Sequence, residues 1–230
     1  SKTIADDYRN WLKDSGISTE PNFDIAYFHL GADLNNSAPT KGMPADAPQT
    51  LAKLTARPSF LMVGTLEPRK GYRHIVDAFT RLWLAGEDVN LVIVGKIGWN
   101  IEGLVRLLQS HQELGKRLIW LQGVSDEYLE RIYADSTVLI AASEGEGFGL
   151  PIIEAAQHGL PVVLRDIPVF REVAGDAGFY FSGRSAEDTA QCLKNWLALY
   201  QAGTHPKSGG LAYQSWEQSV QQIRTVLALP

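Results

Sequence analysis

The chain has 230 residues, 45% of them hydrophobic, and a formal net charge of −5. This length and apolar content suffice for one large domain with a substantial core. The acidic balance excludes the broad basic face that general nucleic-acid binding needs. Cys192 is the only cysteine, which excludes an internal disulfide and a multi-cysteine metal site and fits a reducing compartment. No apolar run approaches the roughly 20 residues that span a bilayer.

Residues 1–34 are predicted to form a helix followed by a connector. Hydrophobic side chains recur at helical spacing within residues 1–15, and they are Ile4, Tyr8, Trp11 and Leu12. Residues 25–30 have the pattern of a short strand, and residues 35–58 have the composition of a loop or linker. The chain has no initiator Met, and charged residues interrupt its start where a signal peptide would be apolar. We interpret it as a fragment that begins in the last helix of an absent N-terminal domain.

Apolar runs and amphipathic segments alternate from residue 60 onward. The predicted strands are residues 60–64, 91–95, 118–121, 138–141, 161–164 and 179–181. The predicted helices run through Ile75, Phe79 and Trp83, through Leu104 and Leu108, and over residues 125–134, 151–158 and 185–200. This alternation predicts an α/β fold, in which a doubly wound, Rossmann-like parallel sheet occupies residues 59–210. Ligands of such folds bind where the carboxyl ends of the strands open into loops.

Residues 211–230 are predicted to form a last helix after the polar residues 203–210. Trp216, Val220 and Ile223 lie along one side of this helix. It either packs on its own domain or crosses back to the absent one, and periodicity alone does not distinguish these alternatives.

The loop after the first predicted strand contains two adjacent cations. Gly64 and Gly71 bound this loop, and Thr65, Arg69 and Lys70 lie between them. Glycines let a ligand approach the backbone, and the following helix start offers free N–H groups and a positive dipole end. A guanidinium can grip a diphosphate with two parallel hydrogen bonds, beside an ammonium that acts as a point charge. The alternative is an ordinary solvated pair of cations on a turn.

The loop after residue 141 combines three glycines with two glutamates. Gly145, Gly147 and Gly149 expose backbone N–H groups and admit close approach of a ligand. Glu146 lies among them, and Glu154 lies in the first turn of the following helix. Both carboxylates can accept hydrogen bonds from sugar or ribose hydroxyls. For Glu154, a purely structural alternative is that it complements the helix dipole.

Two other functions are compatible with the second loop. A dinucleotide fingerprint is incomplete, because Leu150 occupies the third glycine position, although Asp166 lies at about the spacing of a ribose-binding acid. A glycosidase would place Glu146 and Glu154 on either side of a glycosidic bond. Neither alternative uses the two cations of the preceding loop.

Several short motifs follow one another along nearly the whole chain. They are His29-Leu30-Gly31-Ala32-Asp33, Gly64-Thr65-Leu66-Glu67-Pro68-Arg69-Lys70-Gly71, Gly123-Val124-Ser125-Asp126, Glu146-Gly147-Phe148-Gly149-Leu150-Pro151-Ile152-Ile153-Glu154-Ala155, Gly159-Leu160-Pro161-Val162, Asp166-Ile167-Pro168 with Glu172, and Ser215-Trp216-Glu217. In this order they resemble the C-terminal half of the group 1 retaining glycosyltransferases, a family with two Rossmann-like domains in the GT-B architecture.

The resemblance implies a role for each loop. Arg69 and Lys70 would neutralise the diphosphate of a nucleotide-sugar donor as charge develops on the leaving group. Glu146 would hold the transferred sugar, Glu154 the ribose, and the loop around Val124 the base. The predicted binding residues are Gly64, Thr65, Arg69, Lys70, Val124, Glu146, Gly147, Phe148, Gly149, Leu150 and Glu154, of which Arg69, Lys70 and Glu146 are the predicted catalytic residues. The family needs neither a metal nor a further cofactor.

The amino-acid sequences of these motifs are most similar to those of bacterial mannosyltransferases of polysaccharide assembly. This resemblance favours GDP-mannose over UDP-sugars as the donor. It implies a cytoplasmic enzyme, at the inner face of the membrane in the full-length protein, that transfers to a glycan or lipid-linked acceptor through the absent N-terminal domain. The fragment alone is then not expected to transfer sugar. Two alternatives are a non-catalytic nucleotide-sugar-binding module and an NADP-dependent oxidoreductase domain.

Overall fold

The computed structural model describes residues 1–33 and 42–227, whose centre is a parallel sheet. The sheet has six strands in the order β3-β2-β1-β4-β5-β6. They are β1 (Ser59–Val63), β2 (Asn90–Val94), β3 (Leu118–Leu121), β4 (Val138–Ala141), β5 (Val162–Arg165) and β6 (Gly178–Phe181). All neighbouring strands are parallel, and the order is that of a doubly wound Rossmann-like sheet, so the predicted fold is confirmed.

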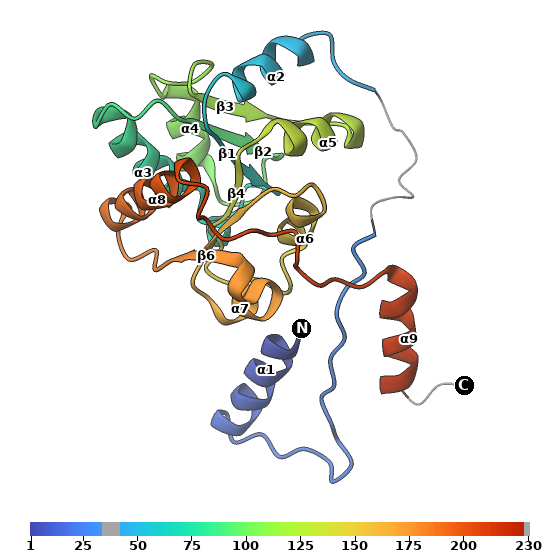
Figure 1. The fold of residues 1–230 in the computed structure, drawn as a ribbon. Coiled ribbons are helices and arrows are strands. Elements are labelled where there is room, and N and C mark those ends of the chain that lie inside the picture. The colour runs from blue at the N-terminus through green and yellow to red at the C-terminus, as the bar shows by residue number, and fades with distance from the viewer. Residues whose placement is uncertain (34–41, 228–230) are drawn as a thin grey trace.

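Helices cover both faces of the sheet (Figure 1). One face carries α3 (Tyr72–Leu84), α4 (Glu102–Ser110) and α8 (Ala186–Gln201), and the other carries α2 (Ala47–Thr55), α5 (Asp126–Asp135), α6 (Leu150–Gln157) and α7 (Pro168–Ala174). Successive side chains of a strand point to opposite faces, so Phe60 packs in one core and Leu61 in the other. Continuous apolar strands are therefore needed to fill both cores.

Residues 25–30 form no strand, and the prediction of one is wrong. The nearby Gly31 makes only an isolated bridge with Gln214. The apolar side chains of the segment instead line a cavity together with α1 (Lys2–Asp14). The presence of α1 confirms the predicted first helix. Within the described residues, the segment pairs with no strand of the sheet, so it stays irregular.

The predicted loop over residues 35–58 contains the helix α2, and this part of the prediction is also wrong. A proline lies at the start of α2, and Ala47, Leu51 and Leu54 form its buried face. The predicted last helix begins later than expected, as α9 (Trp216–Val226), because Ser215 and Gln218 form a capping box at its start. Residues 34–41 and 228–230 of these predicted segments lie outside the described residues.

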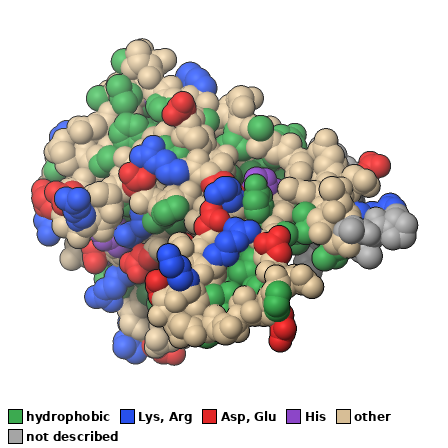
Figure 2. All heavy atoms as spheres, turned by 90° about the horizontal axis from the view of Figure 1, so that it is seen from below, with side chains coloured by type: hydrophobic (Ala, Val, Ile, Leu, Met, Phe, Trp, Pro, Cys, Tyr) green, Lys and Arg blue, Asp and Glu red, His purple; other side chains and the backbone are tan. Residues whose placement is uncertain are grey.

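Helices α1 and α9 lie outside the two helical layers of the sheet (Figure 1). Both expose large hydrophobic side chains, including Tyr8 and Trp11 on α1 and Trp216 and Val220 on α9. From below, hydrophobic side chains lie among interspersed acidic and basic ones, and this face has no field of a single charge sign (Figure 2). Within residues 1–33 and 42–227, no helix has the length and apolar character needed to cross a membrane.

Candidate functional site

The two predicted loops open at the same edge of the sheet. The chain proceeds from β1 outward through β2 to β3 and then returns to β4 on the other side of β1. The strand order therefore reverses between β1 and β4, which is where doubly wound sheets bind ligands. The short helix η1 (Pro68–Lys70) follows β1, and residues 142–149 follow β4.

Three of the predicted residues meet between these loops. The carboxylate of Glu146 accepts hydrogen bonds from Arg69 and Lys70, one on each oxygen. Its side chain is only 10% exposed and that of Lys70 18% exposed, so the carboxylate is largely buried between two cations. The hydrogen bond from Arg69 to Glu146 raises the pKa of Arg69. Arg69 also contacts the carboxylate of Glu67, with 3.0 Å between Nε and Oε2.

A glycine allows the two loops to approach each other. Gly71 has a φ of 71°, and a Cβ atom at this position would lie 2.3 Å from the carbonyl oxygen of Ala142. The backbone N–H of Glu144 donates to the carbonyl oxygen of Arg69 at 2.8 Å. The buried guanidinium of Arg165 holds the second loop from below, since its Nε donates to the Ala142 oxygen at 2.8 Å. Gly71 and Arg165 therefore both contact Ala142, at the start of the loop that carries Glu146.

Lys70 and Glu146 line a small cavity beside the strand ends. It holds about 20 Å³, roughly the space of one water molecule. Tyr72, at the start of α3, is 2% exposed and donates its hydroxyl to the Gly64 carbonyl oxygen at 2.7 Å. Burial raises the pKa of Tyr72. The sequence prediction did not include Tyr72, although its place directly after Gly71 in the first loop motif was a usable signal.

The glycine-rich loop has an open side and a packed side. Nothing lies within 4 Å of a Cβ atom built at Gly145 or Gly147, so a ligand can reach the backbone there. A Cβ atom built at Gly149 would instead lie 3.1 Å from the Phe170 ring, and Gly149, with a φ of 100°, immediately precedes α6, which begins at Leu150. Phe148 is buried and shapes the loop.

Glu154 and Val124 make their contacts elsewhere. The hydroxyl of Tyr133 donates to Glu154 Oε2 at 2.7 Å, and burial raises the pKa of Glu154. Val124 follows β3 and lines a separate cavity of about 380 Å³ together with residues 42–46. The hydrogen bonds and ion pairs of the described residues thus join Arg69, Lys70 and Glu146, but not these two residues.

The structure also informs the alternatives. The exposed Asp166 directly follows β5 and accepts two hydrogen bonds from Arg171, at 2.7 and 2.9 Å. Both oxygens of Glu146 are ion-paired with cations, whereas a glycosidase acid must donate a proton from one of its carboxyl oxygens to the glycosidic bond. Within residues 1–33 and 42–227, no three His, Cys, Asp or Glu side chains gather as a metal site would require.

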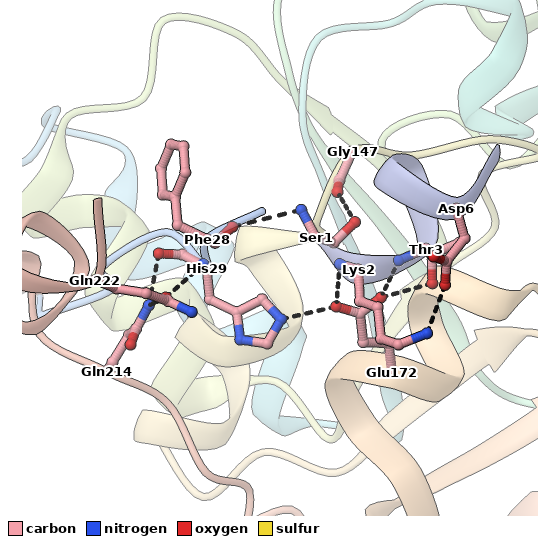
Figure 3. A network of polar contacts seen from close by, with 10 residues as sticks. All are labelled: Ser1, Lys2, Thr3, Asp6, Phe28, His29, Gly147, Glu172, Gln214 and Gln222. Carbon is pink, nitrogen blue, oxygen red and sulfur yellow. Dashed lines mark hydrogen bonds and ion pairs between the residues drawn. The ribbon is translucent and has the colours of Figure 1, made fainter. Parts of the chain in front are cut away.

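A second polar network connects the second loop to α1 (Figure 3). Glu172 on α7 accepts the first backbone N–H groups of α1, from Lys2 and Thr3, each at 2.7 Å. It also lies 2.7 Å from Nε2 of His29, whose ring packs 5.3 Å from that of Phe148. Burial alone would raise the pKa of Glu172, but hydrogen bonds from Thr3, His29 and Lys2 outweigh burial and lower it to about 2.

The same histidine joins the C-terminal segment to this network. The carbonyl oxygen of His29 accepts a hydrogen bond from Gln214, and the N–H of His29 donates to Gln222 at 3.0 Å (Figure 3). The same carbonyl oxygen also accepts from the hydroxyl of Ser219. The hydroxyl of Ser1 donates to the Gly147 carbonyl oxygen at 2.7 Å. Helices α1 and α9 are therefore both tied to the edge of the candidate site.

This network predicts a pH-dependent stability. A carboxylate with a lowered folded-state pKa contributes stability fully above its ordinary pKa of about 4.3, and the contribution is lost as the pH falls toward about 2. We expect Glu172→Gln to lower the melting temperature clearly at pH 7 and hardly at all near pH 2. Thermal melts across this range test the prediction, with Glu187→Gln on an exposed ion pair as the control. A melting difference that is the same at every pH would contradict it.

Comparison with known proteins places the chain in a family. Residues 46–208 match the family described as "Glycosyl transferases group 1". The chain is 48% identical over 225 residues to the serotype-specific mannosyltransferase WbdA of Escherichia coli, covering 97% of this chain but 28% of that protein. It is 38% identical over 122 residues to the O-antigen chain mannosyltransferase B of Escherichia coli, covering 51% of this chain and 31% of that protein. The chain thus spans about a quarter to a third of these relatives.

Solved structures share the fold. HepE of Anabaena in complex with UDP and glucose has a TM-score of 0.64 at 21% identity, over 81% of this chain and 53% of that one. The C-terminal domain of a glycosyl transferase group 1 family protein (LpcC) from Francisella tularensis has a TM-score of 0.56 at 19% identity, over 81% of this chain and 95% of that domain. The fold is therefore that of the C-terminal half of GT-B proteins. Because the family match extends over more than half of its residues, the chain belongs to the group 1 glycosyltransferases.

Proposed function

We propose that this chain binds the nucleotide-sugar donor of a retaining mannosyltransferase, with GDP-mannose as the donor. The observation that carries the proposal is the meeting of Arg69, Lys70 and Glu146 at the strand-order reversal between β1 and β4. The names of the mannosyltransferase relatives support mannose, and the UDP complex of HepE supports a nucleoside diphosphate in this fold.

Each group has a role that follows from its chemistry. Arg69 and Lys70 bind the diphosphate and stabilise the charge that develops on it as the sugar leaves. The carboxylate of Glu146 accepts hydrogen bonds from the sugar hydroxyls, and the open backbone N–H groups at Gly145 and Gly147 donate hydrogen bonds to them. The sugar is transferred with retention of configuration to a glycan or lipid-linked acceptor, which a further domain of the whole protein binds. The protein acts in the cytoplasm, and the two cations replace a metal.

A calorimetric titration of the isolated chain tests this function. The ligands are GDP-mannose, GDP, UDP, UDP-glucose and NADPH, all measured at one salt concentration. We expect GDP-mannose and GDP to bind more tightly than the uridine ligands, and NADPH to give no heat of specific binding. Binding of NADPH without binding of any sugar nucleotide would overturn the proposal in favour of an oxidoreductase domain. Transfer by the full-length protein separates an enzyme from a non-catalytic binding module.

Glu154 provides a separate test of the ribose contact. If its carboxylate accepts a ribose hydroxyl, Glu154→Gln should weaken guanosine binding about tenfold, the range of a hydrogen bond to a charged group. Tyr133→Phe removes the hydroxyl that now occupies Glu154 but keeps the carboxylate, so it should preserve guanosine binding. Unchanged binding by Glu154→Gln would assign Glu154 a structural role.

A further inference from the structure

We propose that Glu146 is an internal counter-ion that makes the site prefer the sugar-bearing donor over the free nucleoside diphosphate. The inference rests on the proposed function of this site and assigns it a source of specificity. It starts from the pairing of both cations with the carboxylate of Glu146.

The carboxylate of Glu146 occupies hydrogen-bonding positions on both cations that a diphosphate would use. Both of its oxygens are engaged, one by Arg69 and one by Lys70. A diphosphate can therefore take the donor groups that now point at Glu146 only if it displaces this carboxylate.

The fate of the displaced carboxylate depends on the ligand. A free nucleoside diphosphate takes the cations and leaves a largely buried carboxylate beside additional negative charge, which is unfavourable. A nucleotide-sugar brings hydroxyl groups on the far side of the diphosphate, and these donate to the carboxylate. Only the sugar-bearing ligand thus compensates Glu146 for its lost partners. After the sugar has been transferred, the return of Glu146 to the cations favours release of the diphosphate product.

Neighbouring acidic side chains do not share this position. Glu67 contacts only Nε of Arg69, at 3.0 Å, among the ion pairs of the described residues. Glu144 is 65% exposed and lies 3.9 Å from Arg165. Glu144 therefore provides a matched control, because it lies in the same loop and its carboxylate carries the same charge but forms no ion pair with Arg69 or Lys70 among the described residues.

Calorimetry with the whole chain tests the inference, using GDP and GDP-mannose on the wild type, Glu146→Gln and Glu144→Gln. We expect Glu146→Gln to bind GDP about tenfold more tightly, as loss of one repulsive charge near the diphosphate predicts. It should bind GDP-mannose no more tightly than the wild type, so the preference for the sugar-bearing ligand falls about tenfold. Glu144→Gln should change both affinities by less than about threefold.

Two results separate the possible failures. If Glu146→Gln binds GDP equally or more weakly than the wild type, the counter-ion inference is wrong, although the site can still be the donor site. If removal of Arg69 and Lys70 leaves GDP affinity unchanged, the proposed diphosphate site itself is wrong. If Glu146→Gln fails to fold, Glu146→Ala takes its place. It also removes the charge and should raise the affinity for GDP in the same way.

Discussion

Replacing both cations, Arg69→Ala with Lys70→Ala, should weaken GDP binding at least about 100-fold while changing guanosine binding less than about threefold. Each charge-assisted hydrogen bond contributes about 1.5–3 kcal/mol, and a diphosphate would lose at least two of them. Guanosine has no phosphate and would lose none. Competition titrations measure the loss of affinity for GDP and the loss for guanosine. The ratio of these two losses assigns the two side chains to the phosphates.

The double variant needs a control for its effect on the fold. Removing both cations leaves the largely buried carboxylate of Glu146 without partners, which destabilises the loop independently of any ligand. A triple variant that adds Glu146→Gln removes this unpaired charge. If GDP and guanosine lose affinity to the same extent in both variants, Arg69 and Lys70 do not bind the diphosphate.

Gly71→Ala should produce the second large effect, on stability. A residue other than glycine at positive φ costs about 1–2 kcal/mol, and here the new Cβ atom would also lie 2.3 Å from the Ala142 oxygen. We expect a total loss of about 3 kcal/mol or more, with a fall in melting temperature of about 10 °C. The two loops would also separate, so GDP binding should weaken.

Gly86 offers a control matched to Gly71. It has a φ of 87°, but nothing lies within 4 Å of a Cβ atom built there. Gly86→Ala should therefore show only the cost of positive φ, a fall of a few degrees, with GDP affinity preserved. Equal melting temperatures for the two variants would show that the approach of Gly71 to Ala142 does not constrain the loops.

The sheet was predictable because its strands are buried on both faces. Each strand contains a continuous apolar run of at least three residues, and β2, with all five residues buried, is the clearest of them. The meeting of Arg69 and Lys70 with Glu146 was predictable for a different reason. Their loops follow strands of a doubly wound sheet, and the reversal of strand order brings such loops together regardless of their separation in sequence.

The errors arose where tertiary partners decide the local structure. Helix α2 was obscured by prolines and glycines around it, and its buried face is evident only against α5 and the sheet. The segment at residues 25–30 has a strand pattern but lines a cavity together with α1. The roles of Arg165 and Glu172 depend on contacts with Ala142 and with the start of α1, which no spacing along the chain encodes.

The pairing of Gly31 with Gln214 restricts how the outer helices can move. The N–H of Ala32 donates to the Gln214 carbonyl oxygen at 3.0 Å, and the N–H of Trp216 donates to Asp33 at 2.6 Å. Gly31 lies so close to Trp216 that a Cβ atom there would be 2.4 Å from its backbone. Residues 31–33 and 214–216 are thus hydrogen-bonded side by side. Because these contacts join the two segments at the start of α9, a rotation of α9 about this point would also move residues 29–33.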